Sequence, residues 1–243
     1  MVETTAHFQL ARFSNQVDIE QLESASVDEL HKLLEHAHSV MGKSSSVHTR
    51  VTVCTEDKNY DTLHALLTDY GYDLFARKYL YRKQLAEEQR LPFNYRWEAI
   101  GMGETNEKRF LEIWKSCMEQ SANRASTRSI ENQLDDVKGL LGEKWQTSCR
   151  IIFQGNIPIA MTIPHLEPGR DGEGRIYYIG TVSAARGKGL GQIVHAASLM
   201  MLKEMGAVIY EGSTHADNLP MQRVFEKNGC KVIRKIATYY KGL

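Results

Sequence analysis

Residues 180–194, GTVSAARGKGLGQIV, hold four glycines and two basic residues in a short segment. The apolar and β-branched run IYYIGTV (176–182) precedes this segment and predicts a strand, and the apolar-periodic run GQIVHAASLMMLKEMG (191–206) predicts a helix that ends at Gly206. The first N–H groups of such a helix lack partners, and the helix dipole favours negative charge there. Because a plain strand-to-helix turn does not need three glycines, the stretch predicts an anion-binding loop.

Two well-known phosphate loops fit this stretch poorly. A Walker A loop needs Ser or Thr after its lysine, but Gly189 follows Lys188. A dinucleotide-binding fingerprint needs a third glycine at the position of Gln192. The remaining alternative is a loop that binds the pyrophosphate of an acyl-CoA.

The composition describes a globular chain with balanced charge. Of 243 residues, 42% are hydrophobic and 25% charged, and 30 basic residues balance 30 acidic ones, so we expect neither nucleic acid nor a membrane surface as a partner. The four cysteines lie far apart without zinc-site spacing, which favours reduced thiols and no metal. No signal peptide or membrane-length apolar run is present, so we expect a cytoplasmic protein.

The pattern after residue 95 predicts a mixed α/β domain. The order is βααβββαβαβ: a strand (95–102), two helices (106–120 and 129–142), a hairpin (148–166), a strand (176–182), a helix (191–206), a strand (207–213), a helix (218–229) and a last strand or hairpin (230–240). The charged run KQLAEEQRLPFNY (83–95), closed by Pro92, predicts a domain boundary. We therefore expect domains at 1–92 and 93–243.

Two motifs in this second domain resemble those of a known family. Arg186, Gly189 and Gly191 match an Arg-x-x-Gly-x-Gly loop, and Asn218 is followed by a helix that closes with Phe-Glu-Lys-Asn-Gly at 225–229. These two motifs stand at the separation expected for the GNAT (GCN5-related N-acetyltransferase) superfamily. Residues 95–243 therefore resemble that superfamily. The resemblance implies a central mixed sheet and a bound acyl-CoA.

The resemblance also implies the residues that contact acetyl-CoA. The backbone of Thr181 and Val182 would pair with pantetheine, on a strand that splays from its neighbour. The pyrophosphate would meet the loop and the start of the helix, with Asn218 near the cofactor arm. The loop residues implied are Arg186, Gly187, Lys188, Gly189, Leu190 and Gly191. Acetyl-CoA is then the cosubstrate, and no metal is implied.

The acid and base are less clearly indicated. The family's usual tyrosine, which protonates the leaving thiolate, is replaced by Phe225, so we consider Tyr178 as the acid, with Tyr177 and Tyr210 as alternatives. His165 and Glu167 follow the hairpin and are candidate bases. Glu98, on the first strand, is a third candidate.

The function implied is acetyl-CoA-dependent N-acetylation of a small-molecule amine by direct attack in a ternary complex. A protein or peptide amine is a less favoured acceptor. The alternative is a non-catalytic acyl-CoA-binding or sensory protein, which Phe225 favours. The sequence leaves open a homodimer.

The N-terminal third repeats part of this pattern. Residues 49–85 and 207–241 both run strand, asparagine, helix, glycine and a strand with paired tyrosines, with Asn59 and Gly71 matching Asn218 and Gly229. We interpret the first segment as a degenerate GNAT half without the glycine loop. Chance similarity between two such segments is the alternative.

Overall fold

The structure is a computed structural model that describes residues 2–12, 16–41, 48–85, 95–123 and 128–242. It divides into two compact units: unit 1 is Met1–Leu80 with Ile233–Leu243, and unit 2 is Tyr81–Val232. The predicted boundary at residues 92 and 93 lies outside the described residues. Within the described ranges no helix is long and apolar enough to span a membrane, and no cluster of three or more His, Cys, Asp or Glu side chains is arranged to hold a metal ion.

The elements from residue 95 follow the predicted βααβββαβαβ order. They are β6 (Tyr95–Ala99), α3 (Glu107–Met118), α4 (Ile130–Leu141), β7 (Arg150–Gln154), β8 (Ile157–Leu166), β9 (Glu173–Thr181), α6 (Leu190–Glu204), β10 (Ile209–His215), α7 (Leu219–Lys227) and β11 (Lys231–Lys241). Sequence reasoning missed the short helices η1 (Gly142–Lys144), α5 (Trp145–Ser148) and η2 (Ser183–Ala185). Strand β9 starts three residues before the predicted strand, because Gly174 and Arg175 pair with the end of β8.

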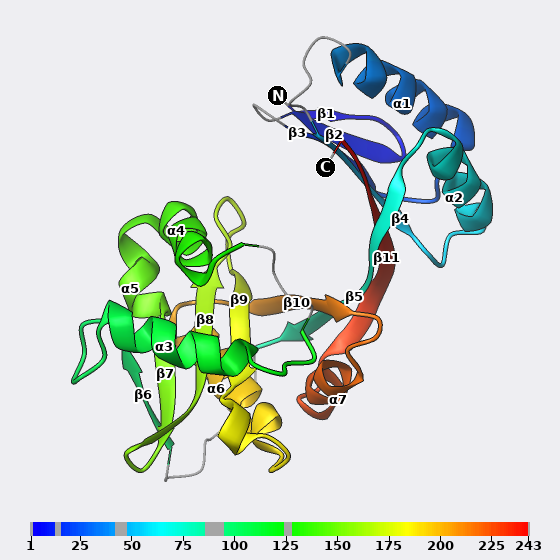
Figure 1. Cartoon of the computed structure of the whole chain (residues 1–243). Helices are drawn as coiled ribbons and strands as arrows, with labels where there is room; N and C mark the ends of the chain where they lie inside the picture. The colour runs from blue at the N-terminus through cyan, green and yellow to red at the C-terminus, as the bar shows by residue number, and fades with distance from the viewer. Residues whose placement is uncertain (1, 13–15, 42–47, 86–94, 124–127, 243) are drawn as a thin grey trace. The chain divides into compact units, whose positions relative to one another are not determined.

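Unit 2 is a sheet covered on both faces. Its strand order is β5-β10-β9-β8-β7-β6, with β5 spanning Asp73–Gln84. Strands β6 to β9 pair antiparallel, and β9 pairs parallel with β10. Helices α3, α4 and α5 cover one face and α6 the other (Figure 1). The buried side chains of Phe110 and Trp114 anchor α3 in this core.

Side-chain caps explain where two of the helices begin. The Asn106 side chain accepts a hydrogen bond from the Arg109 N–H at the start of α3, and the Ser129 side chain does the same for Asn132 at the start of α4. The predicted start at Ser129 is confirmed. These caps fix where α3 and α4 begin.

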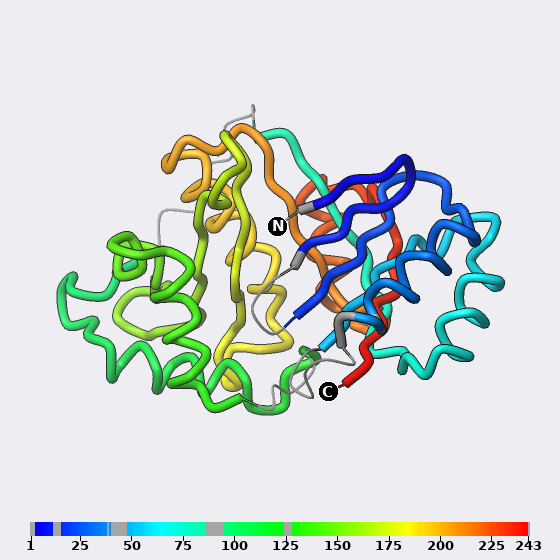
Figure 2. The backbone as a smooth tube through the Cα atoms, turned by 90° about the horizontal axis from the view of Figure 1, so that it is seen from above, coloured from blue at the N-terminus to red at the C-terminus, as the bar shows by residue number. Residues whose placement is uncertain are grey.

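Unit 1 has its own sheet and core. Its elements are β1 (Val2–Thr4), β2 (Phe8–Arg12), β3 (Gln16–Gln21), α1 (Val27–Met41), β4 (His48–Cys54) and α2 (Tyr60–Asp69), together with most of β5 and β11. The strand order is β1-β2-β3-β4-β11-β5. The C-terminal strand, red in Figure 2, belongs to the unit that the first residues, blue, also form. The strand, helix and long strand predicted over 49–85 are present, whereas β1, β2, β3 and α1 were not predicted.

Candidate functional site

Strands β9 and β10 diverge from each other along most of their length. Their parallel pairing is confined to Ile209 with Glu173 and Tyr210 with Gly174. Beyond these pairs β9 continues to Thr181 and β10 to His215 without pairing together. On its other edge β9 stays paired with β8 as far as Thr181. The β10-side edge of β9 therefore carries backbone N–H and C=O groups available to a ligand.

An irregularity in β8 lies beside the point of divergence. The register between β8 and β9 shifts between Thr162 and Pro164. Proline has no N–H to donate to the ladder, and such an irregularity bends a strand and increases its local twist. We attribute the turning of β9 away from β10 to this local bend.

The glycine loop, residues 186–191, follows β9 after the short helix η2. Gly187 has φ 76° and Gly189 φ 72°, a left-handed backbone that favours glycine. A Cβ added at either position would meet no atom within 4 Å, so the outer side of the loop is open. The two glycines therefore serve the backbone conformation of the loop rather than close packing.

The loop presents a row of backbone donors. Among the residues that the structure describes, no backbone carbonyl accepts from the N–H groups of residues 187–191. Gly189 is the N-cap of α6, so the positive end of that helix dipole adds to these donors. The arrangement is able to bind an anion such as a phosphate.

Two predicted cofactor residues also have structural partners. The Arg186 guanidinium donates to the carbonyls of Cys117, at 2.8 Å, and of Glu119, at the end of α3. The Asn218 side chain accepts from the Met221 N–H at 3.2 Å and donates to Asn123 Oδ1 at 2.9 Å. Their contacts with the cofactor stay predictions, as do those of Thr181, Val182 and the exposed Lys188.

Tyr178 lies on the diverging part of β9. Its ring centroid is 5.3 Å from that of Trp114, and a Cβ added at Gly180 would lie 3.0 Å from its hydroxyl. Burial raises the pKa of Tyr178, so the hydroxyl keeps its proton at neutral pH. A protonated hydroxyl is the form that a general acid requires.

Phe225 has a packing role in this structure. It is buried, and its ring stacks on that of Tyr81 at 4.4 Å. Tyr210 packs beside it and is itself buried. The side chain at the family tyrosine position is thus part of the core.

His165 and Glu167 lie together at the end of β8. The His165 Nε2 atom is 3.4 Å from Glu167 Oε2. Burial lowers the pKa of His165, although the Glu167 carboxylate opposes the shift, so the imidazole is neutral at neutral pH. A neutral imidazole beside a carboxylate can accept a proton.

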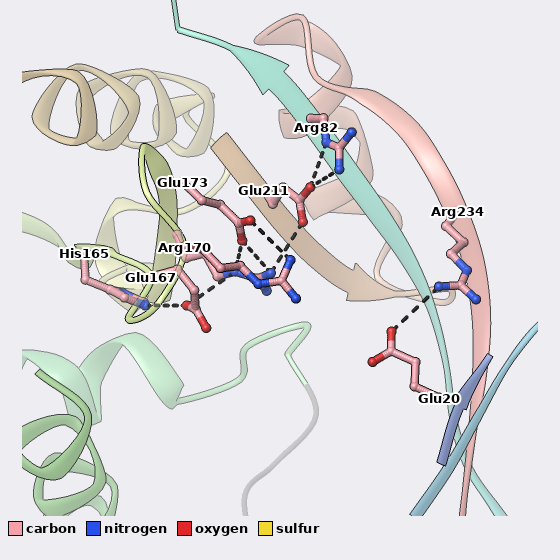
Figure 3. A network of polar contacts seen from close by, with 9 residues as sticks. Glu20, Arg82, His165, Glu167, Arg170, Glu173, Glu211 and Arg234 are labelled. Carbon is pink, nitrogen blue, oxygen red and sulfur yellow. Dashed lines mark hydrogen bonds and ion pairs between the residues drawn. The ribbon is translucent and has the colours of Figure 1, made fainter. Parts of the chain in front are cut away.

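An ion-pair network connects this pair with the point where β9 and β10 diverge. Arg175 lies 3.4 Å from Glu167, 2.6 Å from Glu173 and 3.4 Å from Glu211. The Nε of Arg82, on β5, donates to Glu211 at 2.7 Å. Figure 3 shows the labelled side chains of His165, Glu167, Glu173, Glu211 and Arg82 along this network.

Sequence reasoning missed Arg175 and Glu211. Arg175 directly follows Gly174, the last residue of β9 that pairs with β10. Glu211 directly follows Tyr210, the last residue of β10 that pairs with β9. For Glu211 the available signal was a charged residue within the predicted strand 207–213, whereas Arg175 lies just before the predicted strand 176–182 and carried no such signal. The point of divergence itself, which gives these charges their place, depends on strand pairing.

Glu98 is not brought to this region. It lies on β6, which β7 and β8 separate from β9 in the sheet order. The Thr105 hydroxyl donates to its carboxylate at 2.8 Å, and this contact, with Arg96, lowers the pKa of Glu98. The side chain therefore closes the turn after β6.

A sequence comparison covers most of unit 2. The sequence model of the acetyltransferase (GNAT) family matches residues 107–230. The match includes the diverging strands, the glycine loop and α7. No curated protein matches the sequence.

Solved structures match nearly the whole chain. A GCN5-related N-acetyltransferase from Sphaerobacter thermophilus has a TM-score of 0.66 at 12% identity, over 96% of this chain and 75% of that one. A GCN5-related N-acetyltransferase from Kribbella flavida has a TM-score of 0.60 at 12% identity, over 99% and 89%. A tandem GNAT protein from the clavulanic acid biosynthesis pathway has a TM-score of 0.61 at 12% identity, over 96% and 78%. These alignments extend through unit 1, which therefore also resembles a GNAT fold.

Proposed function

The chain belongs to the acetyltransferase (GNAT) family, and we propose that it transfers the acetyl group of acetyl-CoA to an amine of a small molecule. One observation carries this proposal: β9 leaves β10 after two residue pairs, and the glycine loop follows it after the short helix η2. The divergence offers a polar strand edge to an extended ligand, and the loop offers donors to an anion at one end of it. A ligand with an amide-bearing arm and a pyrophosphate matches both features.

The residues of unit 2 would hold acetyl-CoA as follows. The backbone of Thr181 would meet the pantetheine arm, and the N–H groups of residues 187–191 would meet the pyrophosphate. Val182 is less available than the sequence predicted, because its N–H donates to the Ile159 carbonyl at 2.9 Å and its own carbonyl accepts from the Ala185 N–H at 2.9 Å. Lys188 is exposed on the same loop and adds positive charge. Arg186 would act through the shape of the loop, since its guanidinium holds the end of α3.

The chemistry needs one proton acceptor and one proton donor. The amine nitrogen bonds to the acetyl carbon, its proton passes to His165, and Glu167 stabilises the imidazolium that forms. The carbon–sulfur bond breaks, and the departing CoA thiolate takes a proton from Tyr178. The lowered pKa of His165 and the raised pKa of Tyr178 leave each group in the protonation state that its role requires.

The test is an acetylation assay on the full chain. We expect acetyl-CoA to raise the melting temperature and CoA thiol to be released only when an amine is present. Mass spectrometry should detect one acetyl group on the amine for each thiol. Binding of acetyl-CoA without thiol release for any amine of a broad panel would instead favour the non-catalytic, sensory function.

A further inference from the structure

A cavity of about 710 Å³ lies in unit 2 at the end of β8. Its apolar wall comes from the ends of α4 and α6 and from the chain after β8. These residues are Leu140, Leu141, Leu166, Pro168 and Met205. The volume is within the range of about 300–1,000 Å³ that is usual for sites of small molecules.

Two buried polar side chains lie in the same wall. Ser148 is 1% exposed and His165 4% exposed, and both line the cavity. The Ser148 Oγ and His165 Nδ1 atoms are buried and have no hydrogen-bond partner among the described residues. A buried polar atom without a partner lowers the stability of the fold, and a ligand that pairs with it would recover that loss.

Charged side chains of both signs lie at the cavity. Glu143 and Glu167 line it together with Lys144, and Arg175 lies 3.4 Å from Glu167. The other ring nitrogen of His165, Nε2, lies 3.4 Å from Glu167 Oε2. In the neutral tautomer that carries its proton on Nε2, Nδ1 is an acceptor. An ammonium or amine group is the partner that an acceptor nitrogen and a carboxylate both suit.

We infer that this cavity holds the acceptor, a primary amine on a compact apolar body. The inference rests on the proposed function, since it places the acceptor beside the proposed base. The apolar wall packs against the body, and the amine lies near His165 and Glu167. Long polyamines fit less well, because they bring several charges to an apolar wall. Amino acids fit less well, because they bring a carboxylate to Glu143 and Glu167.

Three amines test the substrate class in the acetylation assay. Phenethylamine has one amine on an apolar body, phenylalanine adds a carboxylate, and spermidine is a polar polycation. We expect kcat/KM for phenethylamine to exceed that of each of the others at least about tenfold, a difference of about 1.4 kcal/mol. An equal or higher kcat/KM for spermidine or phenylalanine would overturn the inference.

Calorimetry of phenethylamine binding tests the site without relying on turnover. Leu140, at the cavity, is 40% exposed, so Leu140→Lys adds a positive charge there with little risk to folding. We expect about tenfold weaker binding, because like charges repel. The matched control Ile157→Lys changes an exposed residue outside the cavity lining, and binding should stay unchanged.

The binding and assay results separate the two proposals. Absent phenethylamine binding, or binding that Leu140→Lys leaves unchanged, contradicts the cavity as acceptor site. Binding that Leu140→Lys weakens, with no thiol release for any amine, keeps the amine site and rejects the proposed acetyl transfer.

Discussion

Units 1 and 2 each contain two parallel strands joined by a helix: β3 and β4 in unit 1, and β9 and β10 in unit 2. Only the strands of unit 2 separate after a short paired stretch. In unit 1, β3 and β4 pair over five residue positions, from Gln16 with His48 to Glu20 with Thr52. In unit 2, β9 and β10 pair at two positions and then separate. The same strand–helix–strand topology therefore produces a closed sheet in one unit and a divergent strand edge in the other.

Side chains of unit 1 seal the end of its strand pair. Gln21, the last residue of β3, accepts from the Cys54 N–H at 2.7 Å and donates to Asp57 Oδ2 at 2.6 Å. The same Asp57 oxygen accepts from the Ala25 N–H at 2.7 Å, just before α1. In unit 1 the Asp57 carboxylate thus accepts from a backbone donor just before α1. At the equivalent place in unit 2, before α6, lies the glycine loop. The comparison indicates that a free strand edge and open donors, rather than topology, distinguish the cofactor site that we propose.

The largest effect on the rate of acetylation should come from replacing the proposed base of unit 2, His165. His165→Gln should lower kcat/KM about 10²–10⁴-fold, because general base catalysis contributes that much. The calorimetric affinity for acetyl-CoA should stay unchanged. His31→Gln, on a half-exposed histidine of α1, is the control and should leave the rate unchanged.

The pH profile sharpens the same prediction. The pKa of His165 is lowered from 6.5, so the imidazole loses its proton below that pH and stays an active base above it. The acidic limb of kcat/KM should therefore lie below pH 6.5 and disappear in His165→Gln. A limb that persists in the variant would assign the base elsewhere.

The next largest effect concerns the open loop. Gly189→Glu places a negative charge at the N-terminus of α6, where we propose the pyrophosphate, and should weaken acetyl-CoA binding about 100-fold, or about 2.7 kcal/mol. Gly155→Glu, at φ 59° in the turn between β7 and β8, has similar backbone strain and open space and should bind normally. Equal affinity in the two variants would reject the loop assignment.

Removing the Asp57 carboxylate from unit 1 should lower the stability of the protein and leave its affinity for acetyl-CoA unchanged. Asp57→Ala removes the acceptor for Gln21, Ala25 and Asn59 and should lower the unfolding free energy by about 2 kcal/mol in urea denaturation at pH 7. Burial raises the pKa of Asp57, but these hydrogen bonds outweigh it and lower the pKa below 3.8. The contribution is therefore present above pH 4 and should be lost as the pH falls below that value.

The neighbouring acid provides the control for this variant. Glu56 forms a surface ion pair with Lys235 at 2.9 Å, so Glu56→Ala should cost less than about 1 kcal/mol. A difference between Asp57→Ala and wild type that persists undiminished at pH 3 would show that the carboxylate charge is not responsible.

The smallest effect compares the two matching asparagines. Asn218 caps α7 through the Met221 N–H, whereas Asn59 at the start of α2 makes no side-chain cap. Asn218→Ala should therefore destabilise the protein by about 1 kcal/mol more than Asn59→Ala, measured as above. Equal losses would mean that the hydrogen bond from the Asn59 side chain to the Ala25 carbonyl, at 2.8 Å, matters as much as a cap.

The element order and the loop were predictable because their signals are local. Helical periodicity, the cap at Ser129 and the glycines at 187 and 189 each act within a few residues. The contacts of Arg186 could not be predicted in this way, because its acceptor carbonyls, at Cys117 and Glu119, lie far away in the chain. The first strands escaped prediction for a related reason: β1 pairs with β2, β2 with β3 and β3 with β4, and these pairings between separate segments decide that they form a sheet.

The sequence by itself determined a glycine-rich loop between a strand and a helix and predicted that it binds an anion, because left-handed glycines and helix N-termini have local causes. It also placed His165 two residues from Glu167. Only the tertiary structure decided that β9 leaves β10, that Arg175 and Glu211 stand at the point of divergence, and that unit 1 is sealed by Asp57. These features depend on strand register and on contacts between distant segments, which the packing of the sheet sets.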